Sequence, residues 1–282
     1  MIRHAASAAL LAVALGTSVQ LHAQSWKTVT SSRQVTDEDH LRVRVSYGAG
    51  VLELRRAESG SLYRTFFRFD EETAVPRTEY HPGTLNVDLS RRENRGLNFG
   101  NRSSEASLDL ELSTEVPLDI QLDFGAGRAE LDLTGLAMRE LEVNTGASES
   151  VVYIDEVNPE QMESASISVG AADLRVRGLG NLNAEEVEIR AGLGSVVLGL
   201  DGEWPRDGFL VVEMGLGALE IRVPESLGVR IQHRKSILSS IDAEGMVKDG
   251  NVYRSVNWDS AERHVEIDIS AALGSIDLVW IN

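Results

Sequence analysis

The chain contains no cysteine among its 282 residues. This absence excludes disulfide bonds, thiol catalysis and a lipid anchor carried on a cysteine. Aromatic residues make up only 5% of the sequence, so few side chains can stack on sugar rings. Beyond the N-terminal signal described next, no apolar run approaches the roughly 20 residues that a membrane-spanning helix needs. We therefore expect no transmembrane segment after that signal is removed.

Residues 1–23 have the features of a secretory signal peptide. Arg3 gives a basic start, residues 5–16 are apolar, and the segment ends at the small residue Ala23, after which we expect cleavage. An exported chain without cysteine is typical of bacterial envelopes rather than of disulfide-stapled secreted modules. The predicted location is the periplasm or the bacterial cell surface.

Positive charge is also scarce. The sequence has 27 Lys and Arg residues against 44 Asp and Glu residues, for a formal net charge of -17. Such an acidic chain is repelled by nucleic acid and by anionic lipid, so we expect no nucleic-acid partner. The acidic residues alternate with apolar ones instead of forming blocks, which indicates an ordered surface rather than a disordered tail.

What the sequence does contain is one short glycine pattern written seven times. It reads G-A-G-V-L-E-L at Gly48 and G-L-G-A-L-E-I at Gly215, and a weaker copy, A-L-G-S-I-D-L, starts at Ala272. The five copies from Gly125 to Gly215 lie between 21 and 24 residues apart. Self-similarity at such a period is the signature of a stacked repeat fold. We predict that one corner of each repeat is formed by Gly48, Gly125, Gly146, Gly170, Gly192, Gly215 and Gly274.

Apolar residues fall into columns when the seven copies are aligned. The column three residues upstream of the motif holds Val45, Leu122, Val143, Ile167, Ile189, Val212 and Ile269. Polar residues alternate with these columns, which predicts two strands per repeat with one buried face. Stacked repeats of this length predict an all-β fold, a single-core parallel β-solenoid of about seven rungs with irregular β caps. The alternative is an antiparallel sandwich, which does not predict columns in register.

Three further features of the sequence predict where the corners of the rungs and the caps of the solenoid lie. The residue after the first glycine is Ala in four copies and Leu in the last three, and we expect this column to turn inward at the corner. The period is interrupted over residues 55–101 and 245–263, which we interpret as caps over the solenoid ends. The second interruption contains Asp249-Gly250, a hairpin signal. A second corner is predicted at Gly135, Asn158-Pro159, Gly178 to Asn181 and Asp201-Gly202.

These motifs resemble those of a known family. The segments V-S-Y-G-A-G-V-L-E-L-R (45–55) and L-D-F-G-A-G-R-A-E-L-D-L-T-G-L (122–136) are similar to the toast-rack N-terminal domain of bacterial envelope proteins. The segments I-R-A-G-L-G-S-V-V-L (189–198) and E-M-G-L-G-A-L-E-I (213–221) are similar to the C-terminal domain of LiaF-type proteins. The resemblance covers residues 40–282 and implies a solenoid with an adhesin-like or envelope-stress role, without shared catalytic residues. LiaF-type proteins have membrane-spanning helices before this domain, whereas this chain has a cleavable signal.

The expected domain organisation follows from the repeats and the resemblance. Residues 1–23 form the signal peptide and residues 24–40 an N-terminal linker. Residues 41–180 form a toast-rack-like N-terminal β block. Residues 181–282 form a LiaF C-terminal-like β-solenoid block that continues the same core.

The residues that could carry chemistry point to no enzyme. His40, His81, His233 and His264 lack metal-ligand spacing, and the carboxylates form no D-x-D-x-D-G calcium loop. The glycine motifs lack the third glycine of a dinucleotide fingerprint and precede strands. We therefore expect no catalytic residue, no cofactor and no metal.

Two features are candidates for partner contact. The first is Trp204 in D-G-E-W-P-R-D-G, which alternatively fills a corner of the core. The second is a basic group, Arg91, Arg92 and Arg95, which alternatively is a solvated loop; His233-Arg234-Lys235 form a second basic group.

The function predicted is a non-catalytic, exported envelope module that acts in binding, as an adhesin does, or as a scaffold. Its partner would be an envelope protein or a glycan, and the solenoid ends could also self-associate. One alternative is a carbohydrate-active β-helix enzyme, which would need a lateral groove with convergent carboxylates. Another is an envelope-stress regulator that acts through a membrane partner.

Overall fold

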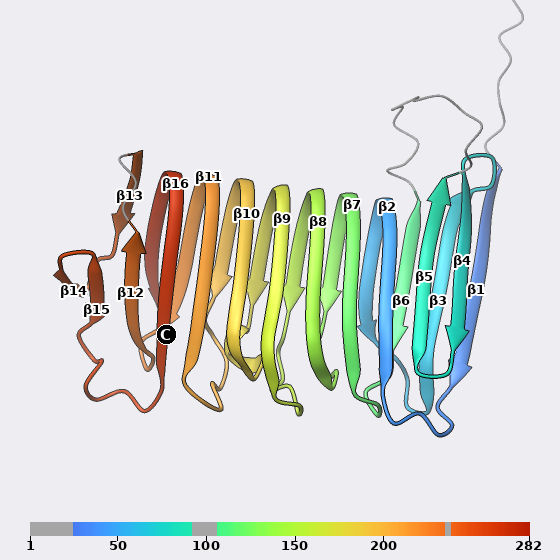
Figure 1. Ribbon diagram of the computed structural model, residues 1–282, viewed down its shortest axis with the longest axis horizontal. Helices are drawn as coiled ribbons and strands as arrows, with labels where there is room; N and C mark the ends of the chain where they lie inside the picture. The colour runs from blue at the N-terminus through green and yellow to red at the C-terminus, as the bar shows by residue number, and fades with distance from the viewer. Residues whose placement is uncertain (1–24, 92–105, 235–237) are drawn as a thin grey trace, which may run out of the picture.

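The computed structural model describes residues 25–91, 106–234 and 238–282, and in these residues almost every element is a β-strand (Figure 1). The strands join into one sheet. The elements are β1 (Trp26–Gln34), β2 (Leu41–Arg56), β3 (Ser61–Asp70), β4 (Ala74–His81), β5 (Thr84–Arg91), β6 (Ser107–Leu112), β7 (Leu118–Asp132), β8 (Met138–Tyr153), β9 (Met162–Arg177), the 3-10 helix η2 (Leu179–Asn181), β10 (Ala184–Gly199), β11 (Gly208–Pro224), β12 (Gly228–Arg234), β13 (Leu238–Asp242), β14 (Met246–Asp249), β15 (Val252–Ser255) and β16 (His264–Ile281).

Seven long strands form the body of the molecule. They are β2, β7, β8, β9, β10, β11 and β16, and each pairs in parallel with the next. In Figure 1 each of them rises, turns over at the top and descends, so that each is one rung. The column predicted from Val45 to Ile269 is confirmed, because its members are Cα partners on neighbouring strands and all are buried. The fold is the predicted parallel β-solenoid.

The turn of each rung lies at the glycine motif. In β10 the buried residues that lead into the motif are odd-numbered, Val187, Ile189 and Ala191, and those that follow it, Val196 and Leu198, are even-numbered. The same change of parity occurs in all seven long strands. Because side chains alternate between the two faces of a strand, a change of parity marks a bend that keeps the inner face inside.

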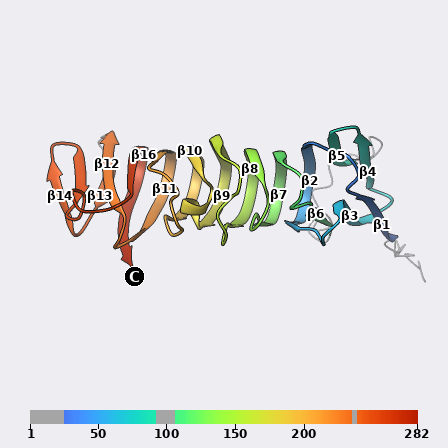
Figure 2. The same cartoon turned by 90° about the horizontal axis from the view of Figure 1, so that it is seen from below.

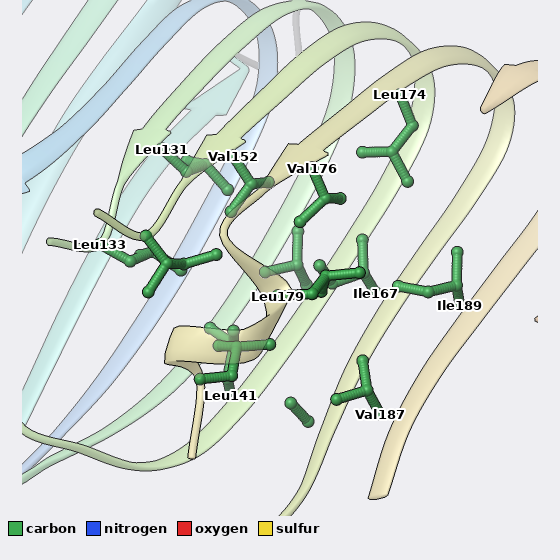
Figure 3. Packing of buried hydrophobic residues seen from close by; sticks show 14 of the residues in the cluster. Leu131, Leu133, Leu141, Val152, Ile167, Leu174, Val176, Leu179, Val187 and Ile189 are labelled. Carbon is green, nitrogen blue, oxygen red and sulfur yellow. The ribbon is translucent and has the colours of Figure 1, made fainter. Parts of the chain in front are cut away.

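The core runs between the two halves of the rungs. Figure 3 shows Leu131, Val152 and Val176 following one another, and these residues are register partners on β7, β8 and β9. Each fully buried aliphatic side chain of this kind stabilises the fold by about 1.5–3 kcal/mol. A single rung cannot enclose a core by itself, so its apolar side chains become buried only when the neighbouring rungs stack on it.

At both ends the outermost rung is made of two separate strands. β5 and β6 pair with the first and second halves of β2, and β12 and β13 pair in the same way with β16. The final strand β16 therefore lies between β11 and β12, so the last glycine copy is not the last rung. Aligning the glycine motifs of this chain does not reveal the split rung at the C-terminal end, because β12 and β13 lack the motif.

Further strands cap the two ends (Figure 2). At the N-terminal end β3 pairs antiparallel with β6 and β1, and β4 pairs antiparallel with β5. The prediction of a linker over residues 24–40 is therefore wrong for residues 26–34, which form β1. At the other end β14 and β15 form a hairpin on β12, and the predicted turn contains Gly250 with a φ of 61°. Of the interruption at residues 55–101, the part from 92 onward lies outside the described residues.

The opposite corner of the rungs is held by buried asparagines. The side-chain oxygen of Asn158 accepts a hydrogen bond from the Met138 N–H at 2.9 Å, and its amide group donates to the carbonyls of Met138 and Leu182. Asn181 donates in the same way to the Ile154 carbonyl. These bonds satisfy buried backbone groups where the chain leaves the strands.

Pairing continues without a break across the expected domain boundary. β9 and β10 are register partners from Met162 and Ala184 onward, and one hydrophobic cluster runs along the whole stack. A division near residue 180 stays a prediction.

Candidate interaction surface at the glycine corner

Three leucines lie in a row on the outside of the glycine corner. Leu193, Leu216 and Leu273 are register partners on β10, β11 and β16, with exposed fractions of 51%, 47% and 39%. We call them the leucine ridge. The prediction that this column turns inward is wrong, because the first two residues of the motif both face outward where the parity changes. In the earlier rungs β8 and β9 the same position holds the exposed residues Ala147 and Ala171.

The column on one side of the leucine ridge carries no charge. Two residues beyond the leucines stand Ser195, Ala218 and Ser275, again in register. On β7, β8 and β9 the same column holds Arg128, Glu149 and Asp173, whereas β2 has Val51 there. The corner thus changes from charged to apolar and neutral at β10, in a chain whose net charge is -17. A contiguous apolar patch on an otherwise charged surface is typical of an interaction site.

A shallow groove of about 640 Å³ runs along the other side of the leucine ridge. We call it the corner groove. Gly192 and Gly215 are among the residues of its floor. A Cβ atom on Gly215 would lie 2.3 Å from the carbonyl oxygen of Gly192, and one on Gly192 would lie 2.5 Å from that of Gly170. From β7 to β11 this column is glycine, so the rungs stack closely and expose backbone to the groove, whereas β16 has Ala272 at the same position.

Ion pairs form the wall of the corner groove. Arg190 bridges Glu188 and Glu213, with 3.5 Å between its Nε and the Glu213 carboxylate. Arg234 donates to Asp268 at 2.5 Å, and this hydrogen bond raises the pKa of the Arg234 guanidinium. Each guanidinium is matched by a carboxylate, so the wall presents hydrogen-bonding groups with little net charge. Together the ridge and groove offer apolar contact, backbone polar groups and guanidinium donors.

The other sequence candidates lie elsewhere. Trp204 is only 8% exposed, and its Nε1–H donates to the Leu200 carbonyl at 2.7 Å. Its ring fills the corner between β10 and β11, as in the corner-filling interpretation, and offers no free face to a partner. Arg91 is the last residue of β5, and Arg92 and Arg95 lie outside the described residues.

The second basic group is not a joint surface. His233 is buried at the end of the column that includes Ile269, and Arg234 is held by Asp268. Lys235 lies outside the described residues. Within residues 25–91, 106–234 and 238–282, no group of three or more His, Asp or Glu side chains is placed to hold a metal ion.

A second, smaller hollow of about 130 Å³ lies on the N-terminal half. It is lined by Arg55, Arg64, Phe66, Asp109 and Glu111, and Arg55 donates to Glu111 at 2.7 Å. With about 640 Å³ against about 130 Å³, the corner groove is the larger of these two hollows.

The fold and the corner define a parallel β-solenoid with an exposed apolar corner. A family model described as the N-terminal domain of toast_rack, DUF2154, matches residues 20–177, which is 158 of the 282 residues. The chain belongs to this family. The part of the chain that the structure describes has no helix long and apolar enough to cross a membrane.

Solved structures with a similar course of the chain have low sequence identity. A proposed cell adhesion protein from Clostridium sporogenes is 16% identical with a TM-score of 0.47, and the match covers 91% of this chain and 100% of that one. A proposed adhesin from Bacteroides fragilis is 11% identical with a TM-score of 0.38, covering 90% and 97%. A proposed lipid binding protein from Parabacteroides distasonis is 13% identical with a TM-score of 0.28, covering 89% and 96%. Comparison with curated proteins gives no match.

Proposed function

We propose that the protein is an exported, non-catalytic module of the bacterial cell envelope that binds a partner through the leucine ridge and the corner groove. The observation that carries this proposal is the alignment of three leucines, each at least 39% exposed, on neighbouring rungs. Burying the exposed part of such side chains against a partner is favourable by about 25 cal/mol per Å² of apolar surface. The signal-like residues 1–23 support export.

The chemistry of the corner groove supports binding rather than catalysis. Glu213 is the carboxylate among the residues that line it, and glycoside hydrolysis needs two carboxylates on either side of the bond. Among the described residues, the pKa values of the Glu38 and Glu115 carboxyl groups are lowered, opposite to the change that a general acid needs. The carbohydrate-active alternative therefore has less support.

The ridge favours a protein over a glycan as the partner. Sugar rings are held by aromatic platforms and by networks of polar side chains, whereas the ridge presents aliphatic leucines beside serine and alanine. A partner protein with its own apolar row would exclude water from this surface.

Crosslinking in living cells tests the proposal. A photoreactive amino acid replaces Leu216 in one variant and Ala147 in a matched control, since both positions are exposed and occupy the same place in their rungs. We expect a specific crosslinked envelope protein from position 216 and a much lower yield from position 147. A glycan adduct would change the class of partner, and equal yields at both positions would refute the role of the ridge.

A further inference from the structure

Four strands of the described chain lie at an outer edge of the sheet with one pairing neighbour each. They are β1 beside β3, β4 beside β5, β13 beside β16 and β14 beside β15. An edge strand presents unpaired backbone N–H and C=O groups, which are a template for another strand. Proteins protect such edges with charged side chains, especially lysine, with proline, and by keeping edge strands short.

Three of the four edges carry a basic residue or proline. β1 contains Lys27 and Arg33, β4 contains Pro76, and β14 contains Lys248. The remaining edge, β13, reads Leu-Ser-Ser-Ile-Asp and has no basic residue and no proline; it is five residues long, and its one charged side chain is the acidic Asp242, which would attract rather than repel a basic strand. β13 is therefore the edge best suited to accept an additional strand.

The core beneath β13 is also less covered than the core beneath its companion β12. On the β12 half, β15 pairs over the end of the solenoid and Tyr253 is buried there. On the β13 half, Ile241 extends the inward column of Ile276 but is only partly buried. Figure 1 shows the β14–β15 hairpin beside β12, below β13. An added strand could place an apolar side chain next to Ile241 and complete the column.

The acidic residues around Asp242 indicate which charged side chain an added strand would carry. Asp242 of β13 is the register partner of Asp277, which is in turn the partner of Glu220. Glu220 is paired with Arg222 at 2.6 Å. Like charges directly opposite one another on neighbouring strands are destabilising, whereas a cationic residue beside Asp242 would be attracted.

We propose that β13 accepts an extended segment of a partner protein as a further parallel or antiparallel strand. That segment places an apolar side chain beside Ile241 and a lysine or arginine beside Asp242. A second copy of this chain is a poor occupant, because both copies carry a net charge of -17 and β13 itself has no basic residue. The site is separate from the leucine ridge, although Leu238 is the register partner of Leu273. The inference does not depend on the function proposed for the ridge.

A synthetic peptide tests this inference on the full chain. The probe has the sequence of residues 273–279 with Asp277→Lys, because this segment of β16 already pairs with β13 from the inner side. The control peptide keeps Asp277. We expect the lysine peptide to bind about tenfold more tightly than the control, by fluorescence anisotropy, and to slow amide exchange over residues 238–242.

Charge reversal in the protein supplies the matched variants. Asp242→Lys should reverse the preference, so that the peptide with Asp277 binds better. Glu130→Lys changes the same charge at the equivalent position of β7, whose two edges are both paired, and should leave both affinities within about twofold.

Three results would overturn the inference. They are no binding of the lysine peptide up to millimolar concentration, equal binding of both peptides, or unchanged exchange over residues 238–242 when the peptide is bound. A dimer of the chain that Ser240→Pro abolishes would show that a second copy is the occupant, which contradicts the partner proposed. None of these results bears on crosslinking from Leu216.

Discussion

At the scale of single residues, the corner glycines are required by the rung below rather than by a bound ligand. In β11 the space where a Gly215 side chain would stand is occupied by the Gly192 carbonyl oxygen, and the same relation recurs from Gly125 to Gly215. Backbone atoms cannot move aside as a flexible side chain can. From β7 to β11 each of these glycines therefore leaves room for the neighbouring carbonyl at the close spacing of parallel strands, about 4.8 Å, and only the last strand of this series, β16, has a methyl group there, on Ala272.

This account predicts the effect of adding a single methyl group. Gly215→Ala should destabilise the protein by about 1–3 kcal/mol, because overpacking against backbone forces the rungs apart. Gly48→Ala is the matched control, since a Cβ there meets no atom of the described residues within 4 Å and its φ is not positive. It should change the stability by less than about 0.5 kcal/mol. Thermal and urea unfolding of the two variants measure the difference, and equal losses would show that the contact with Gly192 is unimportant.

At the scale of elements, the N-terminal cap is fastened by Glu38 in the connection between β1 and β2. Its carboxylate accepts hydrogen bonds from the Thr36 N–H at 2.7 Å, the Tyr80 hydroxyl of β4 at 2.9 Å and Arg33 of β1 at 3.2 Å. Burial of the carboxylate opposes ionisation, but these hydrogen bonds outweigh it and lower the pKa of Glu38 to about 2. One side chain thus joins two edge strands and a loop.

The lowered pKa gives the cap a defined dependence on pH. A carboxylate with a folded pKa below its unfolded value stabilises the fold above the unfolded value of 4.5, and this contribution is lost as the pH falls toward 2. The side chain of Glu38 is only 3% exposed. Glu38→Gln should therefore lower the free energy of unfolding by about 1–3 kcal/mol near pH 7 and by much less near pH 2. Thermal unfolding at the two pH values is the measurement. Asp39→Asn, a change in a neighbouring exposed residue, is the control. If Glu38→Gln lowers the stability by the same amount at both pH values, the ionised Glu38 carboxylate does not fasten the cap.

The elements also show what the sequence could predict. The seven long rungs and their columns could be predicted because glycine spacing and period-2 alternation persist over the stack. β12 and β13 could not be recognised as a rung, since each pairs with half of β16 and neither carries the glycine motif. The leucine ridge was visible as a change from Ala to Leu, but its orientation was not, because alternation alone does not say where the parity changes at a bend.

At the scale of the whole molecule, the same repeat that builds the core arranges the surface. Register stacking places Leu193, Leu216 and Leu273 in one line, as it places buried residues in columns inside. A change at one position of the motif therefore becomes a stripe along the solenoid rather than an isolated side chain. The charged corner of the earlier rungs and the apolar corner of the later ones divide one continuous rod into two surfaces.

The most direct test of the ridge as the binding surface compares two triple variants in cells. The first carries Leu193→Ser, Leu216→Ser and Leu273→Ser, and the second carries the equivalent Ala126→Ser, Ala147→Ser and Ala171→Ser in the earlier rungs. These side chains lie outside the core, so both variants should keep the thermal stability of the parent. Both variants carry the photoreactive amino acid at the exposed neighbouring position Ala218, because Ser replaces Leu216 in the first variant. The account predicts that recovery of the crosslinked partner falls at least about tenfold in the leucine variant and stays within about twofold in the alanine variant. Unchanged recovery in the leucine variant, with its fold intact, would contradict the account.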